Sequence, residues 1–138
     1  MRVYIDGVFD LFHRGHLEAL NKTKYIENNV ELIVGVISDE DTKTYKRCPI
    51  INEIDRVEII KNIKCVDEVI FPAPLIVTKK FLEENNIDYV VHGFSNEKDR
   101  LIQREFFKEL IEIGKFKEIK YYDKCSTTEI IDKIKKLY

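Results

Sequence analysis

Residues 3–20 read VYIDGVFDLFHRGHLEAL, and the organisation of the whole chain can be understood from this stretch. The apolar run at residues 3–5 predicts a buried strand, because it is too short for a helix. The pair Asp6-Gly7 then predicts a turn, since glycine permits backbone angles that other residues resist. His13 and His16 follow at the expected start of a helix. A strand, a glycine turn and a helix N-terminus often hold phosphate, because free N–H groups and the positive end of the helix dipole point at the ligand.

Composition limits the classes of function. The 138 residues are 44% hydrophobic and 35% charged, which is typical of one soluble globular domain. The net charge of −2, with both signs interspersed, gives no indication of a nucleic-acid partner or of attraction to anionic membranes. No apolar run could cross a bilayer, and charges interrupt residues 1–20, so neither a membrane segment nor a signal peptide is expected. Three scattered cysteines (Cys48, Cys65 and Cys125) lack metal-ligand spacing, which favours a cytoplasmic protein without a metal site of its own.

Strand patterns alternate with helix patterns along the whole chain. Strands are expected at residues 3–5, 30–37, 68–71, 89–92 and 115–121. Helices are expected at about residues 15–27, after an N-cap at Asn52, at 78–85, at 101–113 and from 127 to near the end of the chain. This alternation predicts one α/β domain, residues 1–138, with a doubly wound, Rossmann-like parallel sheet. Ligands bind beyond the carboxyl ends of the strands in such sheets. Four polar segments are expected there, at residues 6–16, 38–52, 92–99 and 121–128.

Two of the helices are expected to bury a regular apolar stripe. Asn52, with Asp55 three positions later, is typical of a helix start. The stripe of that helix is Ile54, Val57, Ile60 and Ile63. The stripe of residues 101–113 is Leu101, Phe106, Leu110 and Ile113. The polar segment 38–52 is expected to be a loop.

The histidine pair is the sharpest chemical signal. Imidazoles three positions apart on one helical turn face the same way, so His13 and His16 can both donate hydrogen bonds to one phosphate. Such donors stabilise a phosphate whose negative charge grows in a transition state. The alternatives for any single histidine here are a surface position or a helix cap.

Ser126, Thr127, Thr128 and Glu129 form the pattern of a capping box, with Ser126 as N-cap and Glu129 reaching back. A capped helix start with three consecutive hydroxyls is also a second anion site, and both interpretations can hold together. Charge pattern alone makes Lys46 one member of a solvated run with Lys43 and Arg47.

Three further residues have two interpretations each. Asp10 could cap the first helix or brace the loop. Arg56 could be an exposed helix arginine. His92 could be a strand-end histidine satisfied by backbone.

Several motifs resemble one enzyme family. GVFDLFHRGH, residues 7–16, resembles the HxGH signature of the nucleotidylyltransferase superfamily, in the version of the cytidylyltransferases that activate phospho-alcohols with CTP. Residues 46–74, KRCPIINEIDRVEIIKNIKCVDEVIFPAP, resemble that family's lysine loop, its helix with an arginine and the VDEV strand. CSTTEII, residues 125–131, resembles the end of the RTEGxSTTxI motif. The spacing of residues 72–93 is similar to the choline- and ethanolamine-phosphate branch.

The resemblance implies a reaction and a set of site residues. The reaction is transfer of CMP from CTP to a phospho-alcohol, giving a CDP-alcohol and pyrophosphate in phospholipid precursor synthesis, with Mg²⁺ accompanying CTP. The implied catalytic residues are His13, His16 and Lys46, with Lys46 gripping phosphates of both substrates and Asp10 ordering the histidines. The implied nucleotide-binding residues are Gly7, Val8, Phe9, Asp10, Gly15, Arg56, His92, Gly93, Ser126, Thr127 and Thr128. A homodimer with a contact at residues 55–70 is also implied.

The chain departs from the family pattern at two places. Tyr121 stands where the RTEG arginine is expected, with Lys120 and Lys124 as nearby substitutes that grip phosphate differently. In the acceptor pocket, Phe94-Ser95 follows His92-Gly93 where an acidic residue is expected, and Leu75 replaces an aromatic ring. An anion and a ring would together hold an ammonium group, and the candidates to compensate are Asp99, Glu97 and Phe94.

The acceptor predicted from the resemblance is phosphoethanolamine or phosphocholine. The alternatives are a glycerol-3-phosphate cytidylyltransferase, an adenylyltransferase of the same superfamily and a non-catalytic nucleotide-binding module.

Overall fold

The computed structural model describes residues 1–138 and contains one five-stranded sheet. The strands are β1 (Arg2–Gly7), β2 (Glu31–Val36), β3 (Glu68–Ile70), β4 (Tyr89–His92) and β5 (Phe116–Glu118). They lie in the order β3-β2-β1-β4-β5, and every neighbouring pair is parallel. The prediction of a doubly wound parallel sheet is confirmed.

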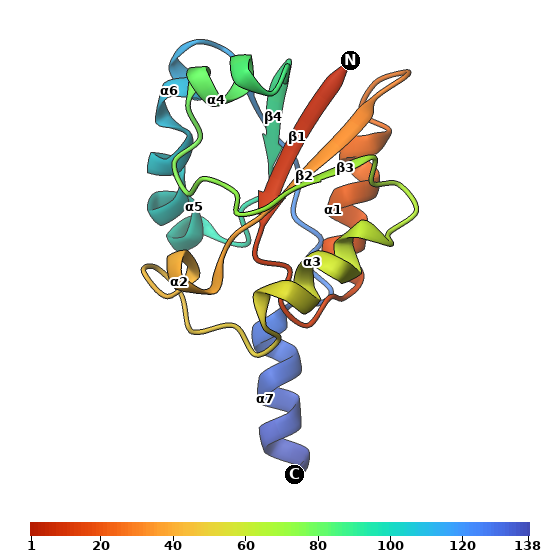
Figure 1. The fold of residues 1–138 in the computed structure, drawn as a ribbon. Coiled ribbons are helices and arrows are strands. Elements are labelled where there is room, and N and C mark those ends of the chain that lie inside the picture. The colour runs from red at the N-terminus through yellow and green to blue at the C-terminus, as the bar shows by residue number, and fades with distance from the viewer.

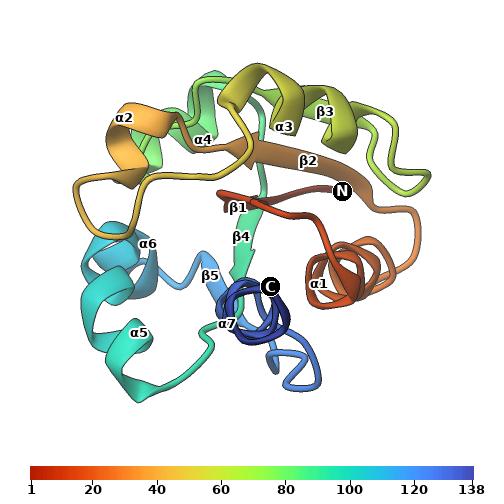
Figure 2. The same cartoon turned by 90° about the horizontal axis from the view of Figure 1, so that it is seen from below.

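Helices cover both faces of this sheet (Figures 1 and 2). They are α1 (Arg14–Lys24), α2 (Asp39–Thr42), α3 (Glu53–Lys61), α4 (Lys79–Glu84), α5 (Glu97–Gln103), the 3₁₀ helix η1 (Arg104–Phe107), α6 (Lys108–Glu112) and α7 (Thr127–Leu137). Helices α1 and α3 pack on one face, and α4, η1 and α6 on the other. Helix α7 projects from the body of the molecule at the end where the strands finish (Figure 1). None of these helices has the length and apolarity to cross a bilayer.

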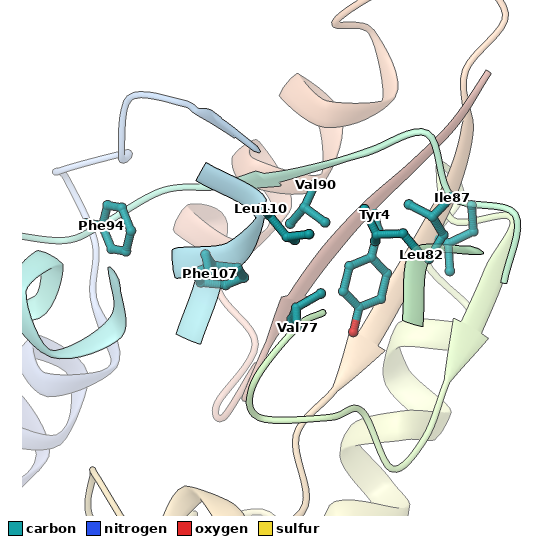
Figure 3. Packing of buried hydrophobic residues seen from close by; sticks show 9 residues of the cluster. Tyr4, Val77, Leu82, Ile87, Val90, Phe94, Phe107 and Leu110 are labelled. Atoms are coloured by element: carbon teal, nitrogen blue, oxygen red, sulfur yellow. The ribbon is translucent and has the colours of Figure 1, made fainter. Parts of the chain in front are cut away.

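The strand alternation divides the core into two layers. Tyr4 and Ile33 face the α4 and α6 side, where Val77, Leu82 and Leu110 pack around them (Figure 3). The neighbouring positions of the same strands, such as Ile5, Leu32 and Val34, face α1 and α3. Both faces of β1 and β2 are therefore buried, which explains their continuous apolar sequences.

The apolar stripe predicted for residues 101–113 is confirmed at Leu110 and in part at Phe106, but it is wrong at Leu101 and Ile113. Leu101 is 67% exposed and Ile113 is also exposed, whereas Phe107 and Leu110 are buried. The segment is not one helix, because the 3₁₀ turn η1 separates α5 from α6. A 3₁₀ helix has about 3.0 residues per turn, so it changes which positions face the core.

Two other local predictions need correction. Residues 38–52 are not wholly a loop, because α2 forms there with Ser38 as its N-cap. In α3 the N-cap Asn52 is confirmed, since its side chain accepts a hydrogen bond from the N–H of Asp55 at 3.0 Å. Ile54 is nevertheless 66% exposed, and the buried positions of α3 are Arg56, Val57 and Ile60.

Arg56 lies inside the fold and not on the helix surface. Its side chain has no exposed area, and its guanidinium donates to the carbonyls of Ile51 (3.0 Å), Val8 (2.6 Å) and Ile37 (3.0 Å). It also pairs with Asp39 Oδ1 at 2.6 Å. Val8 follows β1, Ile37 follows β2 and Ile51 precedes α3. One side chain therefore joins three segments at the carboxyl edge of the sheet.

We expect Arg56→Ala to lower the free energy of unfolding by about 3–5 kcal/mol, because it leaves buried carbonyls and a carboxylate without their partner. Urea unfolding followed by circular dichroism measures this. Arg14→Ala is the control, since the exposed Arg14 forms an ion pair with Glu18 on its own helix and a cation–π contact with Tyr122, and its loss should change the stability little. An Arg56→Ala protein as stable as the parent would show that the network does not hold the fold.

Candidate active site

A cavity of about 770 Å³ opens at the carboxyl ends of β1 and β4. These two strands are neighbours at the middle of the sheet, where successive crossovers run to opposite sides, and ligands bind at this position in open α/β sheets. All four polar segments expected to build the site contribute to its lining. The predicted site residues that line it are Gly7, Val8, Phe9, Asp10, Gly15, His16, Lys46, His92, Gly93, Ser126, Thr127 and Thr128.

Two predicted site residues do not line the cavity. Arg56 is enclosed by its four acceptors and does not reach the cavity. Its role is to hold the walls of the site. His13 stacks against the ring of His16, with ring centroids 3.9 Å apart and planes inclined by 26°.

The histidine pair forms the N-terminus of α1. His13 is its N-cap, and its Nδ1 accepts a hydrogen bond from the N–H of Gly15 at 3.0 Å. His16 Nδ1 accepts from the N–H of His13 at 3.2 Å, which completes a reciprocal capping box. The helix-cap interpretation of these histidines is therefore correct, and it also fixes how the rings can act.

Because both Nδ1 atoms accept hydrogen bonds, the single proton of each neutral ring is on Nε2. His13 Nε2 is buried and has no partner in the protein. Buried polar atoms are normally paired, so a donor left free in this way suits a ligand acceptor.

Both rings are held neutral. Burial, with smaller contributions from His13 and Lys46, lowers the pKa of His16 to about 3. Burial also lowers the pKa of His13, against a smaller opposing effect of Glu129. At neutral pH the pair therefore offers hydrogen-bond donors and not positive charges.

Gly15 is required by the close approach of His13. A Cβ atom at this position would lie 2.8 Å from Cε1 of His13 and 3.1 Å from the carbonyl oxygen of Cys125. A side chain here would displace either the imidazole or the segment that leads into α7.

Asp10 does not order the histidines, in contrast to the prediction from resemblance. Its carboxylate accepts from the N–H groups of Ile50 at 2.8 Å and Ile51 at 2.9 Å. Its carbonyl accepts from the hydroxyl of Thr127 at 3.1 Å. Asp10 thus braces the loop, the second interpretation given above, and it ties the turn after β1 to both the lysine loop and α7.

Lys46 is exposed to the cavity, with its ammonium 5.5 Å from the centroid of the Tyr45 ring. Desolvation lowers its pKa, which the charges of Asp99 and Asp6 oppose. No carboxylate lies within ion-pair distance of its ammonium. The ammonium is therefore free to meet a ligand anion.

Asp6 is a site residue that sequence reasoning missed. It lies at the end of β1, is only 7% exposed and lines the cavity, yet its carboxylate accepts no hydrogen bond. The side chain within ion-pair distance of it is His92, whose Nδ1 is 3.5 Å from Asp6 Oδ1 and has no hydrogen bond of its own. His92 is thus not satisfied by backbone. An acidic residue at the end of a buried central strand was the available signal for Asp6.

The start of α7 forms another wall. Ser126 Oγ accepts from the N–H of Glu129 at 3.1 Å, which confirms the N-cap. The side chain of Glu129 does not reach back to complete a box; it lines the cavity. Of the proposed substitutes for the missing arginine, Lys120 lines the cavity and Lys124 does not.

The residues proposed to replace the missing anion and aromatic ring differ in whether they line the cavity. Asp99 lines the cavity, and its carboxylate accepts from Ser95 and Gln103. Phe94 is buried in the core against Phe116, and Glu97 does not line the cavity. Tyr45 is among the aromatic residues that line the cavity, and its ring lies edge-on to Phe106 with centroids 5.3 Å apart.

Comparison with known proteins gives one consistent family. Residues 4–133 match the cytidylyltransferase-like family. The chain is 40% identical over 139 residues to choline-phosphate cytidylyltransferase 2 of Arabidopsis thaliana, covering 100% of this chain and 46% of that protein. It is 35% identical over 136 residues to the ethanolamine-phosphate cytidylyltransferase of Dictyostelium discoideum, covering 97% of this chain and 36% of that protein. The chain thus spans less than half the length of these relatives.

A solved structure shares the fold. The crystal structure of the lipopolysaccharide core biosynthesis protein from Thermoplasma volcanium GSS1 superimposes with a TM-score of 0.70 at 28% identity. The superposition covers 89% of this chain and 98% of that one.

We expect the ring of His16 to remain neutral when the pH falls from about 8 to about 5, because its pKa is about 3 and not near 6.5. Nitrogen-15 NMR of the histidine rings follows this directly. In Lys46→Met a nearby positive charge is lost, so the pKa of His16 should rise, whereas Lys43→Met removes a charge outside the cavity and should leave it unchanged. Titration of His16 with a midpoint near 6.5 in the parent would contradict the buried, neutral pair.

Proposed function

The chain belongs to the cytidylyltransferase-like family, and we propose that it transfers CMP from CTP to a phospho-alcohol in phospholipid precursor synthesis. The observation that carries this proposal is the histidine pair, with both Nδ1 atoms held by backbone and the buried His13 Nε2 left without a partner. Donors fixed in this way match a phosphate that gains charge during reaction.

The proposed chemistry is a direct displacement. A phosphate oxygen of the acceptor attacks the α-phosphorus of CTP, the new O–P bond forms, and the bond to the β-phosphate breaks to release pyrophosphate. The attacking oxygen is already ionised at neutral pH, so no general base is needed. Catalysis then depends on positioning and on charge stabilisation. Neutral histidines suit this role, because they donate hydrogen bonds without having to move a proton.

Each wall of the cavity has a part in this reaction. His16, which lines the cavity, donates from Nε2 to the α-phosphate, and His13, which stacks against His16 and does not itself line the cavity, supplies a second Nε2 donor. Lys46 bridges phosphates of the two substrates as a point charge. The N-terminus of α7, with the hydroxyls of Ser126, Thr127 and Thr128, receives the β- and γ-phosphates, because its free N–H groups and dipole favour negative charge.

Mg²⁺ would enter as part of the nucleotide. The structure contains no group of three or more histidine, cysteine or carboxylate side chains arranged for a metal ion. Mg²⁺ commonly keeps several waters and binds substrate phosphates with one or two carboxylates, so the β- and γ-phosphates of CTP would supply its main ligands. Bound there, it would neutralise charge on the leaving pyrophosphate.

The acceptor end of the cavity favours an alcohol that carries an ammonium group. Asp6 is 7% exposed and its carboxylate accepts no hydrogen bond, with only His92 Nδ1 near it at 3.5 Å, and a further cation or donor would stabilise such a buried carboxylate. Asp99 and the Tyr45 ring also line the cavity. The carboxylates of Asp6 and Asp99 both act on the pKa values of Tyr45 and Lys46. Phosphoethanolamine and phosphocholine carry the required cation, and glycerol 3-phosphate does not.

Two further proposals concern the protein as a whole. A homodimer is supported by Ile54 and Ile59, which α3 leaves exposed within or beside the segment that resembles the family's subunit contact. A monomer in analytical ultracentrifugation would contradict it. A cytoplasmic location is supported by the three cysteines, all of which are free.

The activity is tested by CTP-dependent pyrophosphate release with phosphoethanolamine, phosphocholine and glycerol 3-phosphate. We expect turnover with at least one ammonium-bearing acceptor and a loss of more than about tenfold in His16→Ala. Release with ATP in place of CTP would indicate an adenylyltransferase. Nucleotide binding by calorimetry without turnover on any acceptor would indicate a binding module and contradict the proposal.

The acceptor assignment has its own matched pair of variants. Asp6→Asn preserves shape and removes the charge, so it should raise KM for the ammonium-bearing acceptor by about tenfold or more. The preference for the ammonium-bearing acceptor over glycerol 3-phosphate should therefore become smaller. Asp55→Asn removes a carboxylate charge from the surface outside the cavity. It should change neither KM for the acceptor nor the preference between acceptors. An unchanged preference in Asp6→Asn would exclude the proposed ammonium contact.

A further inference from the structure

Arg47 is a cavity residue that the resemblance does not assign. It follows Lys46 in the segment between α2 and α3, and both side chains line the cavity. Its Nη2 donates to the hydroxyl of Thr128 at 3.2 Å, in the first turn of α7. The guanidinium thus spans from the lysine loop to the helix start that carries three hydroxyls.

The charge of Arg47 has no counterion. Arg2, Arg14, Arg56 and Arg100 each have a carboxylate oxygen within ion-pair distance, and Arg47 has none. A guanidinium has five N–H donors, and Thr128 takes one of them. The remaining donors are available to a ligand.

Arg47 also lies near a like charge. Its guanidinium contributes to the lowered pKa of Lys46, after the larger effect of desolvation. Neighbouring cations repel each other, and a bound polyanion would relieve that repulsion. The pair therefore suits a ligand with several negative charges.

The two cations have different partners. The charges of Asp99 and Asp6 act on Lys46, and its ammonium lies 5.5 Å from the centroid of the Tyr45 ring. Arg47 instead donates to Thr128 of α7, beside Ser126 and Thr127. The carboxylate of Asp10 accepts from the N–H groups of Ile50 and Ile51, three and four positions beyond Arg47, and so anchors the end of this segment.

We propose that Arg47 binds the β- and γ-phosphates of CTP, and the pyrophosphate that leaves, while Lys46 bridges the acceptor phosphate and the α-phosphate. This inference rests on the proposed function. The planar fork of an arginine can bind two phosphate oxygens at once, which the ammonium of Lys120 on the same cavity cannot do. Glu129 also lines this wall, and its negative charge would repel a bound triphosphate. The positive charge of Arg47 offsets that repulsion.

Steady-state kinetics of Arg47→Ala tests the division of roles. We expect KM for CTP and the inhibition constant of pyrophosphate to rise by about tenfold or more, and KM for the acceptor to change by less than about threefold. Arg47→Lys should recover part of the loss, because it keeps the charge without the fork. Lys43→Ala is the matched control, since Lys43 is an exposed cation on the same segment that does not line the cavity.

Direct binding of pyrophosphate separates this inference from the proposed function. Calorimetry with pyrophosphate alone needs no turnover, and binding should weaken about tenfold in Arg47→Ala but not in Lys43→Ala. Unchanged pyrophosphate binding, or an equal rise in KM for both substrates, would overturn the assignment of Arg47. Absence of CTP turnover in the parent would overturn the proposed activity instead. Urea unfolding of Arg47→Ala confirms that the variant is folded.

Discussion

The cavity depends on the buried guanidinium of Arg56. Its acceptors are carbonyls that follow β1 and β2, a carbonyl that precedes α3, and the carboxylate of Asp39. These groups would otherwise be buried without partners, which is costly, so the network favours one arrangement of the three segments. Asp10 extends this network. Its carboxylate accepts hydrogen bonds from the end of the lysine loop, and its carbonyl accepts one from the hydroxyl of Thr127. Loops that could move independently are thereby joined at the edge of the sheet where the ligand binds.

Two groups of polar side chains line this cavity. Asp6 and Asp99 are acidic, and their charges act on Lys46 and Tyr45. The second group is the start of α7, with its N-cap Ser126, and the guanidinium of Arg47. The histidine pair at the start of α1 contributes donors without charge. A substrate pair with a cation at one extreme and a polyphosphate at the other matches this distribution, which is why the proposed acceptor and the proposed role of Arg47 support one another.

The two histidine rings that cap α1 are also the proposed hydrogen-bond donors to the substrate. Each Nδ1 satisfies a backbone N–H that the start of the helix would otherwise leave free, and this fixes the proton on Nε2. Gly15 permits the ring of His13 to lie where a Cβ atom would clash. The spacing of the motif thus follows from helix geometry, and the reactive property of the rings follows from their burial.

Short-range patterns in the sequence were sufficient for the strands β1, β2 and β4, the N-caps Asn52 and Ser126, and the four polar segments that line the cavity. Apolar periodicity and capping depend on residues a few positions apart, so the sequence alone contains that information. It did not contain the 3₁₀ turn in residues 104–107 that moves Leu101 and Ile113 to the surface. Nor did it show that Arg56 is enclosed, that Asp10 holds the loop, or that Asp6 faces His92 without a hydrogen bond. These properties arise from segments that are tens of residues apart and meet only in the folded chain, because the burial of a charged group is decided by which distant partners surround it.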